Sequence, residues 1–166
     1  MRFEVRQRIA APLADVADAF CDPGYYEALA SAPKLGKPEV LSREVDGDQV
    51  VLRIRFLFSG DLSSAVTAVL DPKKLTWVDE SHHDLVRHVV RFELQPDHYA
   101  DRLACRGTYR LESDPRDPET TIRIAEGDVK VRAPLVASKV EKALISGLEE
   151  HVQAEAAIVA AYVHRS

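Results

Sequence analysis

Cysteine, tryptophan and methionine are scarce in this sequence, which has two cysteines, one tryptophan and one methionine among 166 residues. Cys21 and Cys105 lie far apart and in unlike surroundings. The N-terminal segment MRFEVRQRIA lacks the apolar stretch typical of a secretion signal. A disulfide is therefore not expected, and we interpret both cysteines as small buried hydrophobic residues.

Long apolar runs and an excess of basic residues are also missing. No stretch approaches the roughly 18 consecutive apolar residues of a membrane-spanning helix, so we expect no stable membrane insertion. The net charge is −5, whereas a dedicated nucleic-acid binder carries a basic face. Hydrophobic residues make up 46% of the chain and charged residues 30%, as in globular proteins. We expect a single domain over residues 1–166, a cytoplasmic location and no nucleic-acid partner.

Catalytic motifs are absent as well, since the sequence has neither a Gly-rich phosphate loop nor a G-x-S-x-G elbow. The segment SHHD, Ser81–Asp84, suggests a metal site, but adjacent His82 and His83 point to opposite faces of a strand. No cysteine or acidic residue stands at a matching ligand spacing. We therefore interpret SHHD as a surface loop, and we predict no catalytic residue, no metal and no cofactor.

Alternation with period two dominates the first four-fifths of the chain. FEVRQRI places Phe3, Val5 and Gln7 on one face of a strand. Asp46-Gly47-Asp48 is a strong hairpin signal between two strands in residues 38–58. Further strands are predicted at residues 74–84, 85–94, 102–112 and 120–133. In the last of these the apolar phase moves from Ile122 and Ile124 to Val129 and Val131, which predicts a β-bulge next to Gly127.

Helical spacing appears in residues 11–20, in one or two turns up to residue 29, and around Ser64 to Leu70, capped near Asp61 or Ser63. The longest helix is predicted from Pro134 to about Val163. Its apolar residues recur every four positions, at Val136, Val140, Leu144, Leu148 and Val152. An amphipathic helix of this length buries its apolar stripe along the concave face of a bent antiparallel sheet.

Three stretches resemble the helix-grip fold of the START/Bet v 1-like (SRPBCC) superfamily: VRQRIAAPLADVADAFCDPGYYEAL, LSREVDGDQVVLRIRF and GDVKVRAPLVASKVEKALISGLEEHVQAEAAIVAAYV. Within it the chain is most similar to the uncharacterised actinobacterial family DUF2505. The resemblance covers nearly the whole chain and implies an α+β fold. A seven-stranded antiparallel sheet would wrap around the long C-terminal helix, with two short helices after the first strand. It also implies a cavity, since members of known role mostly bind lipids, sterols, polyketides or hormones between sheet and helix, and the aromatase/cyclases do chemistry there.

We predict that this cavity has an apolar wall with a glycine in its helical part. Glycine inside a helix costs about 1 kcal/mol relative to alanine, so Gly147 either leaves room for a ligand or lets Trp77 or Phe92 pack closely. The alternation does not settle which face Trp77 takes, and we place His151 at the edge of the core. The candidate wall residues are Leu52, Ile54, Phe56, Phe58, Trp77, Val90, Phe92, Cys105, Leu144, Gly147 and Leu148.

A polar end to the cavity follows from an assumed strand register. If PDHYA is the turn before the strand at residues 102–112, His88 lies opposite Tyr109. If DPRDPE is the next turn, Glu126 lies opposite Gly107, and opposed residues have Cβ atoms about 5 Å apart. We predict that His88, Tyr109 and Glu126 form a polar patch. Alternatively, these groups satisfy one another, or a one-residue slip sends them to solvent.

The leading functional hypothesis is binding, or binding and transport, of a small hydrophobic or amphipathic ligand such as a lipid or polyketide. The first alternative is an enzyme of the cyclase/dehydratase or hydrolase kind, with His88 or Glu126 as base and Tyr109 as proton donor. The second is a protein-interaction module with a filled cavity. We expect a monomer or homodimer in which Tyr25, Tyr26 and the segment 62–70 cover the cavity mouth.

Overall fold

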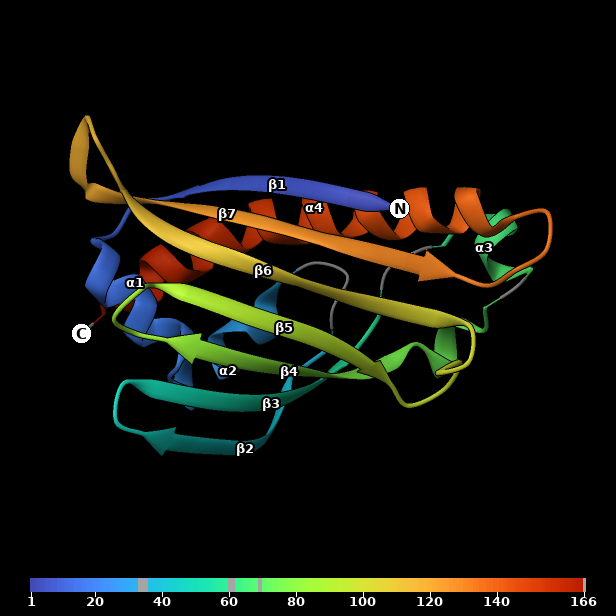
Figure 1. Cartoon of the computed structure of the whole chain (residues 1–166), viewed down its shortest axis with the longest axis horizontal. Coiled ribbons are helices and arrows are strands. Elements are labelled where there is room, and N and C mark those ends of the chain that lie inside the picture. The colour runs from blue at the N-terminus through green and yellow to red at the C-terminus, as the bar shows by residue number, and fades with distance from the viewer. Residues whose placement is uncertain (33–35, 60–61, 69, 166) are drawn as a thin grey trace.

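The computed structural model describes residues 1–32, 36–59, 62–68 and 70–165 (Figure 1). In these residues seven strands form one antiparallel sheet in the order β1-β7-β6-β5-β4-β3-β2. The strands are β1 (Arg2–Ile9), β2 (Glu39–Asp46), β3 (Gln49–Leu57), β4 (Thr76–Asp84), β5 (Val89–Pro96), β6 (Leu103–Asp114) and β7 (Asp117–Val131). The helices are α1 (Leu13–Phe20), α2 (Pro23–Ala28), α3 (Ser64–Thr67) and α4 (Ala137–Val163), with 3₁₀ turns at Leu29–Ser31 and Pro72–Lys74.

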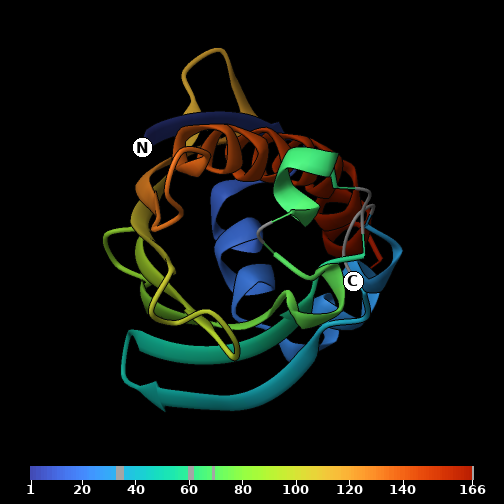
Figure 2. The same cartoon turned by 90° about the vertical axis from the view of Figure 1, so that its right-hand side faces the viewer.

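The sheet curls around a central space that α4 closes on its open side (Figure 2). α1 lies inside the curl at one end of the molecule, and α3 lies at the other end (Figures 1 and 2). α4 contacts β1 and β7 of the sheet and also all three shorter helices. The predicted α+β helix-grip architecture, with its seven-stranded sheet and long C-terminal helix, is confirmed.

Local sequence explains where several elements turn or begin. Gly47 has a φ of +57° in the β2–β3 hairpin, a backbone conformation that glycine adopts without steric cost. The predicted hairpin at Asp46-Gly47-Asp48 is thus confirmed. Ser63 precedes the first residue of α3, while the alternative cap Asp61 lies outside the described residues.

Two glycines face each other on the inner side of the sheet, Gly107 on β6 and Gly127 on β7. A Cβ on Gly107 would lie 2.7 Å from Cζ of Phe92, and a Cβ on Gly127 would lie 2.7 Å from Cζ of Phe3. Each phenylalanine ring therefore occupies the place of the missing side chain. Glycines inside strands mark sharp bends and close approach, which fits the strong curl of the sheet here.

The predicted β-bulge at Gly127 is wrong. The β6–β7 register is continuous from Leu103 opposite Val131 to Ser113 opposite Thr121, and the shift comes after Ser113, beside the hairpin turn. The apolar residues of β7 change phase because Ile122 and Ile124 lie on the outer face of the sheet, whereas Val129 and Val131 lie on the inner face.

Ile124 shows how an apolar side chain is buried on that outer face. It lies between Arg6 of β1 and Arg110 of β6 in the register, yet it is only 3% exposed. Arginine side chains cover apolar surface with their methylene stems while the guanidinium stays in water. The inward residue at this level of β7 is consequently Arg123.

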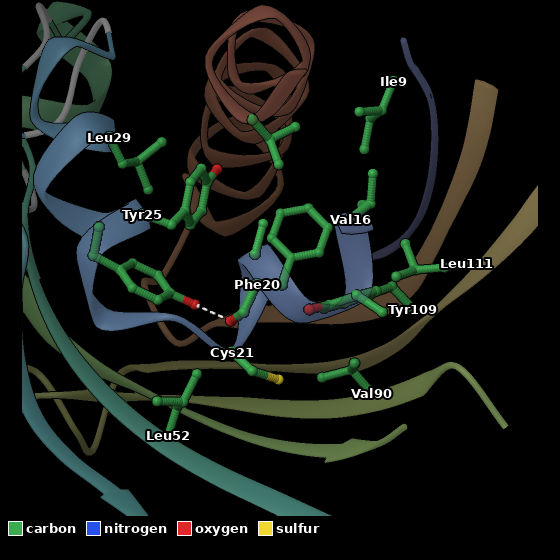
Figure 3. Packing of buried hydrophobic residues seen from close by; sticks show 14 of the residues in the cluster. Ile9, Val16, Phe20, Cys21, Tyr25, Leu29, Leu52, Val90, Tyr109 and Leu111 are labelled. Atoms are coloured by element: carbon green, nitrogen blue, oxygen red, sulfur yellow. Dashed lines mark hydrogen bonds between the residues drawn. The ribbon is translucent and has the colours of Figure 1, made fainter. Parts of the chain in front are cut away.

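The interior contains two hydrophobic clusters, one at each end of the molecule. The first gathers α1, α2 and the adjoining strand ends, and Figure 3 shows Val16, Phe20, Tyr25 and Leu29 packed within it. The second joins the other halves of the strands to α3 and the first half of α4. Cys21 belongs to the first cluster and Cys105 to the second, both as buried free thiols, so their predicted role as small buried residues is confirmed.

Candidate functional site

A cavity of about 310 Å³ lies between the inner face of the sheet and α4. Ligand sites for small molecules typically occupy about 300–1,000 Å³. Ser63, Lys74 and His98 line the cavity and are themselves exposed, so it reaches the surface at the α3 end. Tyr25 and Tyr26 are buried beside α1 at the opposite end, where Tyr26 lines the inner limit of the cavity, so their predicted place at the mouth is wrong.

Nine of the predicted site residues line this cavity: Phe56, Phe58, Trp77, Phe92, Cys105, Tyr109, Leu144, Gly147 and Leu148. The inward face of Trp77 is now settled, and its ring stacks on Phe56 with centroids 5.9 Å apart. A Cβ on Gly147 would meet no atom within 4 Å. Gly147 therefore does not serve close packing against Trp77 or Phe92, and open space stands where its side chain would be.

Three predicted wall residues are buried elsewhere. Leu52, Ile54 and Val90 belong to the hydrophobic cluster around α1 and α2 and are not among the residues that line the cavity. They face inward as the alternation predicts, but the short helices fill the interior beside them. The cavity runs from the α3 end as far as Phe20 and Tyr26, which form its inner limit beside α1 and α2.

His88 is not on the inner face of a strand, so its predicted place in the polar patch is wrong. It lies in the turn between β4 and β5 with a φ of +53°. Val90 stands opposite Tyr109, because β5 and β6 pair two residues away from the assumed register. Tyr109 itself does face the cavity.

Glu126 lies on the outer face, so this prediction is also wrong. It stands opposite Thr108, and its carboxylate lies 3.4 Å from the Arg110 guanidinium. The register shifts beside the hairpin turn, because Asp114 pairs with Asp117 whereas the preceding Ser113 pairs with Thr121. A one-residue change of register moves every side chain of a strand to the other face.

The same difference in the β6–β7 register places Arg123 on the inner face of the sheet, where it contacts Glu155 of α4. An Arg123 guanidinium nitrogen lies 2.7 Å from a Glu155 carboxylate oxygen, and the Tyr25 hydroxyl donates to the other oxygen at 2.6 Å. The guanidinium also lies over the rings of Tyr109, at 4.2 Å, and Phe20, at 4.9 Å. Figure 3 shows these three aromatic residues together on the α1 side of the interior.

The ion pair holds both groups charged in spite of their burial. Burial opposes the charge of each, yet Glu155 raises the pKa of Arg123 and Arg123 lowers the pKa of Glu155. The sequence does carry a signal for Glu155, because it continues the buried stripe of α4 between Val152 and Val159. The candidate residues predicted from the sequence nevertheless did not include it.

Asp79 is the second acidic residue that sequence reasoning missed. It faces the cavity from β4, in a row with Ile54 of β3 and Leu94 of β5. Its Oδ1 is buried and has no hydrogen-bond partner among the described residues. Burial raises the pKa of Asp79 to about 7, although Arg123 lowers it in part.

Two histidines near the cavity are held neutral by burial. His83 on β4 lies 3.0 Å from the Ser81 hydroxyl, and burial lowers its pKa to about 4. His82 points outward to Glu80, so the predicted opposition of the two rings is confirmed, although Ser81–Asp84 belongs to β4 and not to a loop. His151 lines the cavity and does not merely border the core; burial lowers its pKa as well.

Among the residues with described positions, no three His, Cys, Asp or Glu side chains are grouped so as to hold a metal ion. In the same part of the chain, none of the helices combines the length and the apolar character needed to cross a bilayer. The polar side chains that line the cavity include Tyr26, Thr76, Asp79, Ser81, Tyr109, Arg123, His151 and Glu155, together with the exposed Ser63, Lys74 and His98 at the mouth.

Comparison with solved structures shows similar folds over almost the entire chain. The protein TTHA0849 of Thermus thermophilus is 18% identical with a TM-score of 0.69, covering 99% of this chain and 98% of its own. The Zhui aromatase/cyclase of Streptomyces sp. R1128 is 20% identical with a TM-score of 0.66, covering 99% and 94%. A START superfamily protein of Mycobacterium smegmatis is 16% identical with a TM-score of 0.59, covering 99% and 97%.

Sequence comparison gives the family. Among curated proteins none matches this sequence. Residues 4–163 match the family described as protein of unknown function DUF2505. The chain therefore belongs to the DUF2505 family, and its fold is the helix-grip fold of the START/SRPBCC superfamily.

Proposed function

We propose that this protein binds a small hydrophobic or amphipathic molecule, such as a lipid or polyketide, between the sheet and α4. The observation that carries the proposal is the cavity of about 310 Å³ with its aromatic and aliphatic wall. A pocket of this kind, with a few convergent polar groups, is the usual form of a ligand site. The fold shared with an aromatase/cyclase and a START superfamily protein supports the same function.

Native mass spectrometry of protein purified from a bacterial host tests the proposal. We expect a stoichiometric adduct that denaturation releases as a small apolar or amphipathic molecule. Gly147→Leu should abolish the adduct, because the new side chain would occupy the open space beside the helix. Gly147→Ala is the matched control and should retain most of it. An adduct of unchanged amount in Gly147→Leu, or no binding of any apolar probe, would contradict the proposal.

Acid–base catalysis in the same cavity is a second candidate, favoured by the pKa of Asp79 near 7. A general base works best with a pKa near the operating pH. Asp79 replaces His88 and Glu126 in this hypothesis, since neither of those lines the cavity. Incubation with 2-decanone in D₂O tests it by mass spectrometry. Deuterium at the α-carbon, lost in Asp79→Asn, would indicate catalysis; binding without exchange would leave only the binding function.

The interaction-module hypothesis has less support. It requires that the protein's own side chains fill the cavity, whereas the space next to Gly147 is open.

A further inference from the structure

We propose that Asp79 anchors the polar group of the ligand, and that the cavity selects amphipathic molecules with a protonated amine over acids of the same length. This inference rests on the proposed function and deepens it. Its basis is the position of one buried carboxyl group among partners that are already engaged.

The surroundings of Asp79 are apolar along the sheet and polar across the interior. Ile54 and Leu94 flank it in the sheet. The charged and titratable groups that face it come from several elements: Tyr26 on α2, Cys105 and Tyr109 on β6, Arg123 on β7 and Glu155 on α4. Its buried Oδ1 nevertheless lacks a hydrogen-bond partner within the described chain. A buried carboxylate without a partner is costly, so a donor from outside the chain would be stabilised there.

The balance of charge in the cavity decides which donor fits best. Arg123 is matched by Glu155 and is further covered by the rings of Tyr109 and Phe20. Ionised Asp79 therefore adds a negative charge that this pair does not match, and Lys74, which also lines the cavity, is exposed at its mouth. A ligand carboxylate would add a second one, and an alcohol would leave the charge as it is. A cationic group would compensate it.

The aromatic side chains next to Asp79 favour the same ligand chemistry. Trp77 is two residues away on the same face of β4 and stacks on Phe56, and both line the cavity. Aromatic ring faces attract cations by about 0.5–2 kcal/mol. An alkylamine or arylalkylamine would place its cation at Asp79 and its apolar part against this wall and towards the open space at Gly147.

Trp77 provides the readout, because it is the single tryptophan of the chain and lines the cavity. Its fluorescence is followed at pH 8 during titration with decylamine, 1-decanol and decanoate, below the concentrations at which they form micelles. We expect decylamine to bind at least about 10-fold more tightly than decanol, a difference that corresponds to about 1.4 kcal/mol. Decanoate should bind more weakly than decanol.

Asp79→Asn keeps the shape of the side chain and removes the charge. We expect it to abolish the preference, so that decylamine binds no more tightly than decanol. Glu93→Gln is the control, since Glu93 is exposed on the outer face of the sheet. The preference in the unaltered protein should also diminish from pH 8 to pH 5.5, because Asp79 takes up a proton around pH 7.

The outcomes separate this inference from the proposed function. Binding of decanol without a preference for decylamine, or a preference that persists in Asp79→Asn, would overturn the role of Asp79 and leave the binding function intact. If none of the three probes binds, the proposed function fails, and the role of Asp79 fails with it.

Discussion

The interior between the sheet and α4 differs between its two ends, although the same face of the sheet lines both. At the α1 end the interior is filled beyond Phe20 and Tyr26, and the charges at this inner limit of the cavity are matched: Arg123 pairs with Glu155, which also accepts a hydrogen bond from Tyr25. At the α3 end a cavity remains, Oδ1 of Asp79 lacks a partner among the described residues, and a Cβ on Gly147 would touch nothing.

This difference distinguishes polar groups that satisfy one another within the fold from a polar group that is left for a ligand. A matched buried ion pair need not add stability, but it can be kept inside the fold at a tolerable cost. At Asp79 burial disfavours the carboxylate, and the nearby charge of Arg123 offsets this cost only in part. Where a protein keeps such a group beside an open cavity, binding of a ligand is the natural compensation. Substitutions at the Arg123–Glu155 pair, at Asp79 and at two glycines test this difference.

The largest effect is expected from breaking the matched pair. Glu155→Gln should lower the free energy of unfolding by about 3–5 kcal/mol, because the buried guanidinium of Arg123 loses its counter-charge. Urea denaturation measures this change. Glu149→Gln, at an exposed position of the same helix, should stay within about 0.5 kcal/mol.

The double variant Arg123→Met with Glu155→Leu sharpens this result. It should recover much of the lost stability, since an apolar pair of similar size avoids the desolvation cost. A double variant less stable than Glu155→Gln alone would contradict the view that charge matching is what this pair supplies.

At Asp79, removal of the charge should raise the free energy of unfolding instead of lowering it. The pKa of Asp79 is raised from 3.8 to about 7, so the folded state binds the proton more tightly than the unfolded state. Its carboxylate therefore destabilises the fold increasingly as the pH rises from about 4 to about 7. Asp79→Asn should raise the free energy of unfolding by about 2–4 kcal/mol at pH 8 and by much less at pH 4. Thermal or urea denaturation at both pH values checks this, and a loss of stability at pH 8 would refute it.

The smallest effects are expected at two glycines that contrast in the same way. A Cβ on Gly107 would lie 2.2 Å from the carbonyl oxygen of Glu126, so Gly107→Ala should cost about 1–3 kcal/mol through overpacking. Gly147→Ala meets no neighbour and removes a glycine from a helix, so it should gain up to about 1 kcal/mol. The melting temperatures of both variants measure the contrast, and equal losses would argue that Gly147 is packed.

Periodicity was enough to predict most of the individual strands and helices, because each presents a regular face, whereas the resemblance to the START/Bet v 1-like superfamily implied how they assemble. The alternation of Phe3, Val5 and Gln7 matches their burial on β1. The four-residue stripe of the last helix matches the burial of Val140 and Val152. These patterns depend on local geometry, which a sequence carries directly.

The candidate site was predicted only in part because it depends on register. Turn geometry sets which residues oppose one another, and the pattern of β6 and β7 does not reveal that Asp114 already pairs with Asp117. Ile124 also made the inner face of β7 hard to predict, because it is apolar but lies on the outer face between two arginines. Arg123 and Glu126 thereby exchanged faces in the prediction. The apolar wall depends less on register across strands, and eight of the eleven predicted wall residues line the cavity.

The central claim is that one end of this interior is filled and the other is open to a ligand. The most direct test is an NMR titration of ¹⁵N-labelled protein with 1-decanol, following the amide signals. We expect saturable shifts at Trp77, Cys105 and Gly147, while the amides of Val16 and Ala17 in α1, which do not line the cavity, stay unchanged. Shifts concentrated in α1 or on the outer face of the sheet, or no saturable shifts at all, would contradict the account.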